Sequence, residues 1–340
     1  MRTIGCLWAD LETNGLGLPS RLLDPLAGEI LLLRVLRRAV QCLALERVVL
    51  LCSPKDENRL KGLALPERCE RMVTEAADVP QRPWLRKARK WSVDGWRGGI
   101  GWTSAFDEEG PPAALWEACQ RFQADAVVKL PSHAPFLDPR LLGDLVDLHL
   151  RRRGSYQFSF AQAPPGLVGE AYHPEFLKTM ADHAMTPRHA LMWSPQREGM
   201  DPQRAECHLD VGERIRNSPW RLSVESPRLW RQAERLLAAG GELPPLGLPS
   251  WDLPREVLCD PGALSPETWG EWIAALGKEG DASVTFGVNA DPLDTPDWSA
   301  RVRATRQAGI YGIHFRTPKN LNEGEAEALL DAELDVVSVL

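Results

Sequence analysis

The sequence predicts an α/β protein of two domains, in each of which strands and helices alternate along the chain. Short apolar segments alternate with amphipathic helical patterns along most of the chain. Its 340 residues exceed the length of a typical single domain. Residues 241–254 hold four prolines, too many for a helix or a central strand. We therefore expect a first domain over residues 1–240, a proline-rich linker over 241–253 and a second domain over 254–340.

The first domain should begin with a strand and continue in alternation. Residues 28–45 are amphipathic and predict a helix. Asp138 before a proline predicts the start of a helix over 138–151, and Ser226 before a proline predicts one over 226–239. The remaining expected elements are strands at 3–9, 47–52, 125–130, 156–161 and 221–224, and a helix at 112–122.

After the linker the same periodicities return in strict alternation. Strands are expected at 256–259, 283–287, 310–315 and 336–340, and helices at 265–277, 297–308 and 322–332. Right-handed crossovers would make this half of a (β/α) barrel or a small open sheet. The last strand, VVSVL, would be an exposed edge that needs cover. We therefore expect a homodimer through the half barrel if the chain ends at residue 340, or further strands if it continues.

Charge and composition exclude several classes of protein. A net charge of −7 argues against a general nucleic-acid binder. The seven cysteines form no CxxC motif, and Cys6 and Cys52 lie in apolar runs, as expected for buried thiols in a reducing compartment. No apolar run reaches the about 18–20 residues of a membrane helix, and the N-terminus turns acidic too early for a signal peptide. We expect a cytoplasmic protein without a membrane span.

Five stretches of the first 240 residues resemble, in order, the signature segments of sugar-nucleotide cytidylyltransferases. That group includes the spore-coat polysaccharide and CMP-sugar synthetase proteins. The stretches are GCLWADLETNGLGLPSRLL, WRGG, VVKLPSHAPFLDP, PPGLVGEAYHPEFL and WRLSVESPRLW. The resemblance implies a Rossmann-like nucleotidyltransferase (GT-A-like) fold, in which the loop after the first strand cradles the nucleotide phosphates.

The resemblance also implies positions for a nucleotide and a metal ion. The implied nucleotide-binding residues are Leu7, Ala9, Asp10, Pro19, Arg21 and Arg97. His133 stands where the family has the aspartate that holds magnesium, and Glu225 stands in place of a second metal aspartate. Arg21 and His133 would be the catalytic residues, and Glu170 matches a glutamate of the family. The implied cofactor is Mg²⁺ with CTP, although histidine suits manganese or zinc better.

The chain departs from the family at charged positions. Asp10 lies near the place of an arginine, and Gly17 replaces another. Both changes remove positive charge from a cradle that works by opposing phosphate charge. His133 is therefore either a ligand or acid/base group, or a loop histidine that fills a vacated pocket. Glu225 is either a metal ligand or a carboxylate beside a helix start.

Other polar and aromatic residues allow both a binding and a structural interpretation. Arg21 and Arg97 either bind phosphate or pair with carboxylates such as Asp24 and Asp94. Glu170 could equally be a solvated glutamate at a strand end. The basic run LRKARK (85–90) is either an anion site or a solvated helix face. Trp91, Trp96 and Trp102 either stack a base or sugar, or pack a loop onto the core.

The second domain resembles the first half of a radical S-adenosylmethionine barrel, in LSPETWGEWIAAL, VTFGVNADPLDTPDW and RATRQAGIYGIHFRT. The resemblance implies a cluster loop with three cysteines, but Cys259 alone is present. We therefore expect no iron–sulfur cluster and no radical chemistry.

Two hypotheses of function follow. In the first, the chain is a degenerate, non-catalytic binding or assembly module related to surface-polysaccharide biosynthesis. In the alternative, it is an active, diverged cytidylyltransferase that moves CMP from CTP to an acidic or surface-polysaccharide sugar. The expected partners are a nucleotide or nucleotide sugar and a second copy of the chain.

Overall fold

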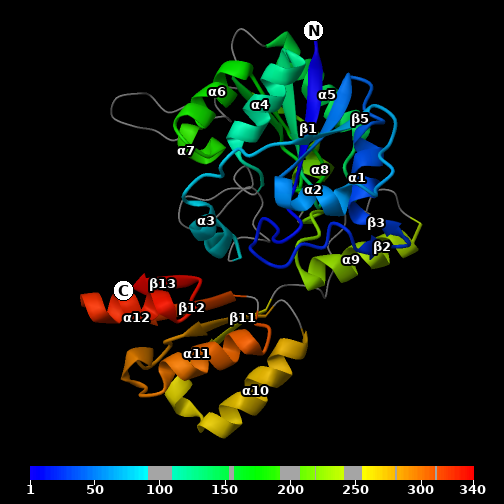
Figure 1. The fold of residues 1–340 in the computed structure, drawn as a ribbon. Coiled ribbons are helices and arrows are strands. Elements are labelled where there is room, and N and C mark those ends of the chain that lie inside the picture. Colours follow the sequence, from blue (N-terminus) through cyan, green and yellow to red (C-terminus); the bar gives the residue numbers. More distant parts are fainter. Residues whose placement is uncertain are drawn as a thin grey trace. The chain divides into compact units, whose positions relative to one another are not determined.

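The computed structural model describes residues 1–90, 109–152, 157–191, 207–218, 220–240, 255–279, 282–310 and 312–340. These residues divide into two compact units, coloured along the chain in Figure 1. The first unit holds the described residues of 1–89, 109–225 and 229–240, and the second holds Lys90, 226–228 and 255–340. The expected linker at 241–253, Arg97 and the tryptophans at 91, 96 and 102 lie outside the described residues. The linker and the domain boundaries built on it remain predictions.

A seven-stranded sheet forms the centre of the first unit, in the order β5-β4-β1-β6-β8-β7-β9. Its strands are β1 (Thr3–Ala9), β4 (Arg47–Cys52), β5 (Cys69–Val73), β6 (Ala126–Leu130), β7 (Phe158–Ala161), β8 (Glu170–Tyr172) and β9 (His208–Leu209). The block β5-β4-β1-β6 is parallel, whereas β8 runs antiparallel to both of its neighbours. Strands β4 and β6 are apolar over almost their whole length because both faces of the sheet are covered.

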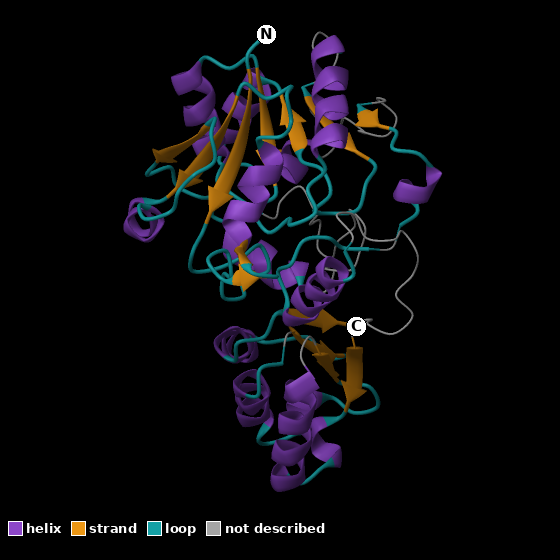
Figure 2. Ribbon diagram, turned by 90° about the vertical axis from the view of Figure 1, so that its right-hand side faces the viewer, coloured by secondary structure: helices purple, strands orange, loops and turns teal. Residues whose placement is uncertain are grey.

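Helices cover the sheet on both faces, which makes three layers (Figures 1 and 2). Helices α1 (Leu31–Ala39), α5 (Pro139–Arg151) and α9 (Pro227–Ala238) pack into one apolar cluster. Helices α4 (Pro112–Phe122), α6 (Pro174–Asp182) and α7 (Pro187–Leu191) pack into a second cluster. The shorter elements are α2 (Pro54–Leu60), α3 (Arg82–Arg89), α8 (Glu213–Arg216) and the hairpin of β2 (Pro25–Leu26) and β3 (Glu29–Ile30). The α/β class with a mostly parallel central sheet is confirmed.

The helix starts in the first unit follow from local chemistry. The side chain of Asp138 accepts hydrogen bonds from the backbone N–H groups of Arg140 and Leu141 and so caps α5, as predicted. Helix α1 buries Leu31, Leu32, Val35, Leu36 and Ala39, a stripe with helical spacing. None of the helices in the described ranges has the length and apolarity needed to cross a bilayer.

The second unit is a four-stranded parallel sheet in the order β10-β11-β12-β13, with helices between successive strands. Its strands are β10 (Arg255–Cys259), β11 (Ala282–Phe286), β12 (Gly312–Thr317) and β13 (Val336–Val339). Its helices are α10 (Pro266–Glu279), α11 (Trp298–Gln307) and α12 (Glu323–Asp331), with short 3₁₀ turns at Pro261–Ala263 and Pro292–Asp294. Trp269, Phe286 and Phe315 lie at the centre of its apolar core. The predicted alternation of four strands and three helices is therefore confirmed.

Two expected elements differ from the structure. The helix expected over 28–45 spans only Leu31–Ala39. It begins late because Glu29–Ile30 pairs with Pro25–Leu26 as a hairpin, and residues 40–45 form turns after it. The prediction of a strand over 221–224 is wrong, because the structure has no strand there. The N–H of Leu222 donates to the carbonyl of Pro165, and that of Val224 donates to the carbonyl of His133. This extended segment therefore bonds to two separate loops and joins no ladder.

Candidate functional site

The order of the strands marks where a ligand would bind. The chain leaves β1 for β4 and β5 on one side and then returns to β6 on the other side. In open α/β sheets, ligands bind beyond the carboxyl ends of the strands at such a reversal. Here β1 is followed by Asp10, and β6 is followed by Ser132 and His133. The sheet thus brings two residues that were singled out in the sequence to its ligand-binding edge.

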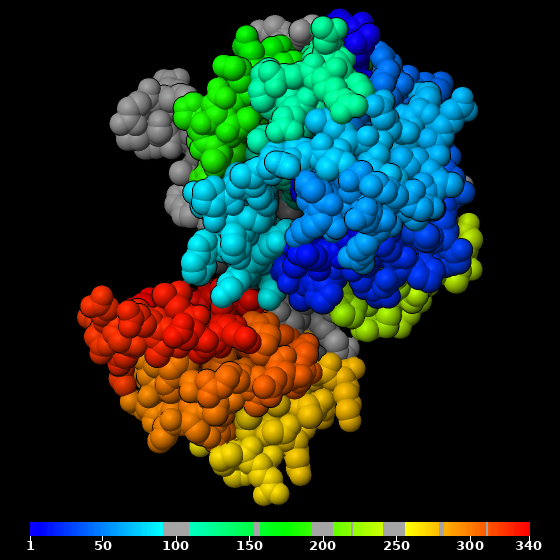
Figure 3. Space-filling view, viewed as in Figure 1, coloured from blue at the N-terminus to red at the C-terminus, as the bar shows by residue number. Residues whose placement is uncertain are grey.

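A cavity of about 460 Å³ opens at the carboxyl ends of β1, β4 and β5. That volume lies within the usual range for small-molecule sites. On the face seen in Figure 3, the surface is hollowed between the blue atoms of residues 53–60 and the cyan atoms of residues 74–89. Among the described residues, four carboxylates and two cations line it: Asp10, Asp56, Glu75, Asp78, Lys55 and Arg86. The lining is therefore acidic overall.

Asp10 is bound by its own loop and by one arginine. Its carboxylate accepts hydrogen bonds from the N–H groups of Glu12 (2.9 Å) and Thr13 (3.0 Å) and from the Thr13 hydroxyl (2.9 Å). The Nη2 of Arg86 lies 3.0 Å from Asp10 Oδ2. Burial acts to raise the pKa of Asp10, but these hydrogen bonds and the Arg86 charge together lower it. Asp10 is thus an ionised carboxylate that shapes the loop after β1.

Arg86 comes from the basic run at 85–90, most of which lies in α3. Its side chain is only 24% exposed, so the solvated helix face considered for this run does not describe Arg86. Lys55, the other cation of the cavity, lies with its Nζ 2.5 Å from Glu12 Oε2. In the described part of the chain, both cations that line the cavity are therefore already paired with carboxylates.

His133 belongs to a buried cluster with Ser132 and Glu109. Its Nδ1 lies 2.8 Å from the Ser132 hydroxyl and 3.2 Å from Glu109 Oε1. The backbone N–H of Ser132 donates to the other oxygen of Glu109 at 2.6 Å. Burial acts to raise the pKa of Glu109, but the hydrogen bond and charge of His133 and the bonds from Ser132 together lower it. The His133 Nε2 is buried and finds no partner among the described residues.

Glu225 lies beside this cluster and is completely buried. Its Oε2 accepts hydrogen bonds from the Nε (3.3 Å) and Nη2 (2.9 Å) of Arg221. Its backbone carbonyl accepts from the side-chain amide of Asn14 at 2.6 Å. Its Oε1 is buried without a partner among the described residues. Since Val224 also bonds to the carbonyl of His133, the loops that carry Asn14, His133 and Glu225 meet at one place.

Gly166 allows the segment at Leu222 and Ser223 to lie close to the loop before β8. It has a φ of +88°, and a Cβ there would lie 2.5 Å from the carbonyl carbon of Leu222. Only glycine combines that backbone conformation with so close an approach. The segment after Leu222 is therefore fixed against the loop before β8.

Of the other implied nucleotide-binding residues, Leu7 and Ala9 lie in β1, and Pro19 and Arg21 lie in the loop that follows it. Arg21 pairs with Asp24 (Nε to Oδ2, 2.8 Å), and its guanidinium lies 3.6 Å from the centre of the Trp230 ring. Pro19 is exposed and forms a β-bridge with Thr13, whereas Leu7 and Ala9 are completely buried. The paired interpretation of Arg21 is thus the one seen here, although phosphate binding by these residues remains a prediction.

Glu170 is not a solvated glutamate. It is 7% exposed, and its Oε2 lies 3.4 Å from the Nζ of Lys129 on the neighbouring strand β6. The two residues are opposite each other in the register of the sheet, which is why the pair forms.

The donors at the expected metal position fit magnesium poorly. Magnesium prefers octahedral oxygen ligands. Here the Glu225 carboxylate already accepts from Arg221 through one oxygen, and His133 offers only a nitrogen. No group of three or more histidine, cysteine, aspartate or glutamate side chains suited to a metal ion occurs within the described ranges.

In the second unit, Cys259 is the last residue of strand β10. Burial, with a smaller effect of Asp260, raises the pKa of its thiol to about 12. All seven cysteines of the chain are free thiols.

Three residues of the site gave no signal in the sequence. Glu109 lies 24 residues before His133, Arg221 lies in a segment expected as a strand, and Asn14 lies in a loop. Their roles come from contacts that the tertiary structure alone creates.

No protein-family model matches the chain, and no curated protein matches it. Several solved structures are similar over about 70% of it. A cytidylyltransferase from Leptospira borgpetersenii serovar Hardjo-bovis is 17% identical, with 70% of this chain and 86% of that chain covered and a TM-score of 0.44. A CMP:2-keto-3-deoxy-manno-octonic acid synthetase in complex with CTP is 13% identical, with 71% and 100% covered and a TM-score of 0.45.

A Mycobacterium tuberculosis protein in complex with manganese is 12% identical, with 69% of this chain and 99% of that chain covered and a TM-score of 0.39. These comparisons concern the fold alone, and similarity this low supports no inference about activity.

Proposed function

We propose that the first unit is a nucleotidyltransferase-like binding module that keeps the sheet and the cavity but does not transfer nucleotidyl groups. The observation that carries the proposal is the internal pairing of the charged groups at the carboxyl ends of the strands. A link to surface-polysaccharide biosynthesis comes from the sequence resemblance alone and stays a prediction.

The charges of the cavity support this proposal. Nucleotidyl transfer from a triphosphate depends on cations that oppose the phosphate charge. Lys55 pairs with Glu12, and Arg86 pairs with Asp10. Four carboxylates line the same cavity, and each would repel a triphosphate. The described cavity therefore offers an anion little favourable charge.

The buried groups near β6 support it as well. His133 holds Glu109 through Nδ1, and Arg221 holds Glu225. Breaking a buried pair to recruit a carboxylate to a metal would leave the other charge unpaired, which is costly. These side chains are thus better explained as a structural network than as an open metal site.

One observation favours the alternative, an active and diverged cytidylyltransferase. The His133 Nε2 and the Glu225 Oε1 are both buried without a partner in the described part of the chain. A manganese ion bound by both would satisfy each of them and would suit a mixed nitrogen and oxygen donor pair. In that case CTP binding should require manganese more strictly than magnesium.

A thermal-shift measurement with CTP, with and without Mg²⁺ or Mn²⁺, separates the two functions. A ligand at 100 times its Kd adds about 2.7 kcal/mol of stability, which is readily seen. The binding-module proposal expects no shift with either metal. A manganese-dependent rise that is lost in Glu225→Gln would support the alternative.

A pair of variants tests whether the carboxylates that neutralise the cations of the cavity prevent CTP binding. Asp10→Asn removes the carboxylate that neutralises Arg86, so it should gain CTP affinity relative to the wild type. Asp182→Asn removes an exposed carboxylate on α6 that lies outside the cavity, and should gain none. Equal behaviour of both variants would contradict the charge explanation.

A further inference from the structure

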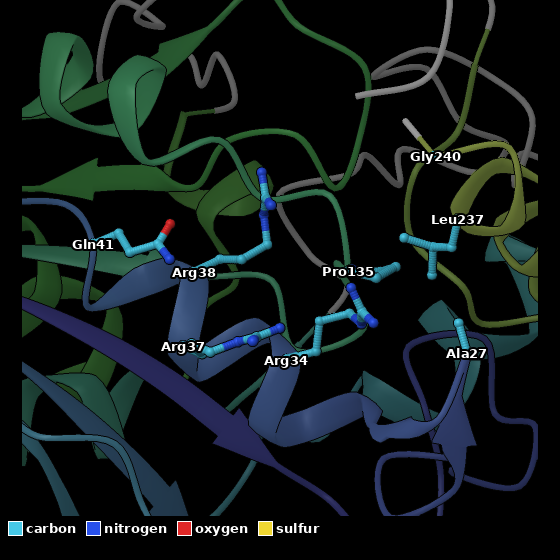
Figure 4. A pocket seen from close by; sticks show the side chains of 8 residues that line it. All are labelled: Ala27, Arg34, Arg37, Arg38, Gln41, Pro135, Leu237 and Gly240. Atoms are coloured by element: carbon cyan, nitrogen blue, oxygen red, sulfur yellow. The ribbon is translucent and has the colours of Figure 1, made fainter. Parts of the chain in front are cut away.

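A second cavity, of about 330 Å³, lies against α1 in the first unit. Three arginines of that helix line it, Arg34, Arg37 and Arg38, as Figure 4 shows. The rest of the lining is Ala27, Gln41, Pro135, Leu237 and Gly240. None of these residues lines the cavity at the carboxyl ends of the strands, so the two cavities are separate.

The helix spacing explains why the arginines gather. Residues three and four positions apart lie on the same side of a helix, so Arg34, Arg37 and Arg38 share one side of α1. The apolar stripe of α1 packs on the sheet. In Figure 4 the side chains of Arg34 and Arg37 extend in the same direction, toward the part of the cavity where Pro135 and Leu237 lie.

The arginines are only partly neutralised. Glu29 Oε2 lies 2.6 Å from Arg37 Nη2 and 3.4 Å from Arg34 Nε. It is the only carboxylate that pairs with either arginine within the described ranges. The Arg34 Nε is buried and makes no well-directed hydrogen bond there. Two guanidinium groups thus share one carboxylate, although the chain as a whole carries a net charge of −7.

A simpler account would make these arginines a complement to the dipole at the end of α1. That account suits Arg37 and Arg38, which lie in the last turn. It does not suit Arg34, which lies one turn earlier and whose side chain is only 16% exposed. Arg38 has a clear structural role, since its Nε donates to the carbonyl of Leu137 at 2.6 Å. The helix dipole therefore leaves Arg34 unexplained, and Arg34 and Arg37 together carry one more positive charge than their shared carboxylate, Glu29, balances.

We propose that this cavity binds a phosphate group through Arg34 and Arg37. The planar guanidinium presents paired N–H donors that match two phosphate oxygens, and charge-assisted bonds of this kind are strong. The phosphate is either inorganic or carried by a small metabolite whose remainder would contact Pro135 and Leu237. Pro135 lies two residues after His133, so the ligand would rest against the back of the loop that carries the His133 cluster.

Isothermal titration calorimetry of the full chain with inorganic phosphate, and separately with a sugar phosphate, tests the proposal. The double variant Arg34→Gln/Arg37→Gln should lower the affinity about 100-fold, roughly tenfold for each arginine. Arg121→Gln is the control, because Arg121 is an exposed arginine on α4, which packs on the opposite face of the sheet. It should leave the affinity unchanged. Tighter binding of the sugar phosphate would identify a metabolite as the ligand, and tighter binding of inorganic phosphate would identify the free anion.

The variant Glu29→Gln guards against a simple loss of folding. It removes the carboxylate that competes for both arginines, so it should bind phosphate about fivefold more tightly than the wild type. A damaged fold would not produce a gain. Absence of phosphate binding by the wild type, or equal binding by the wild type and the double variant, would overturn the proposal. Because neither outcome involves CTP, the result is independent of the function proposed for the other cavity.

Discussion

Replacing Arg221 with methionine should strongly destabilise the first unit. The side chains of Arg221 and Glu225 are 2% and 0% exposed, and they are joined by a 2.9 Å ion pair. Methionine keeps most of the volume but leaves the Glu225 carboxylate buried and uncompensated. Removing one partner of a buried pair costs about 3–5 kcal/mol. For a unit of this size each kcal/mol lowers the Tm by about 2–4 °C, so a fall of roughly 6–20 °C is expected.

Differential scanning calorimetry of the full chain measures this effect. Arg214→Met is the control, since Arg214 is exposed on the short helix α8, and it should change stability by less than about 0.5 kcal/mol. The double variant Arg221→Met/Glu225→Leu should recover most of the loss, because replacing both partners with apolar groups is often neutral. If Arg221→Met behaves like the control, Glu225 is not held by this pair and its interpretation as a structural group is wrong.

Three further outcomes follow from single residues. Because the pKa of Asp10 is below its usual value, its ionised form stabilises the fold above about pH 4, and this contribution is lost as the pH falls through the native pKa. Asp10→Asn should therefore cost about 1–2 kcal/mol at pH 7 in urea unfolding, and its difference from the wild type should close as Asp10 becomes protonated in the native state. Gly166→Ala should cost more than about 2 kcal/mol in the same assay, because its Cβ would collide with the backbone of Leu222, and a smaller loss would mean that the two segments separate easily. With a pKa raised to about 12, Cys259 should be alkylated by iodoacetamide at pH 8 on the order of a thousandfold more slowly than in the unfolded chain, and comparable rates would show that the thiol is not protected.

Elements with a strong local pattern could be predicted from the sequence. Strands β1 and β4 and helix α4 have the bounds expected of them, because each combines an apolar pattern with a clear start. Short elements such as β8, of three residues, carry too little pattern to be recognised. The segment 221–224 has the alternation of a strand, but its hydrogen bonds go to loops that only the folded chain brings near.

The residues of the candidate site could likewise be predicted only in part. His133, Asp10 and Glu225 could be singled out because they stand at positions of a recognisable pattern. Two of their partners, Glu109 and Arg86, could not be assigned, since an ion pair over a long sequence separation leaves no periodic signal. Arg221 lies only four residues before Glu225, but the strand expected over 221–224 gave no reason to pair the two side chains. The burial of Glu170 depends likewise on its register against Lys129, which no single segment reveals.

The most direct test of the account is a calorimetric titration of the wild-type chain with CTP in the presence of Mg²⁺ and, separately, Mn²⁺. If the charges at the carboxyl ends of the strands are satisfied by internal pairs, no binding should be detected with either metal at millimolar CTP. Metal-dependent binding of CTP that is abolished by both His133→Ala and Glu225→Gln would contradict the account and would identify an active nucleotide site.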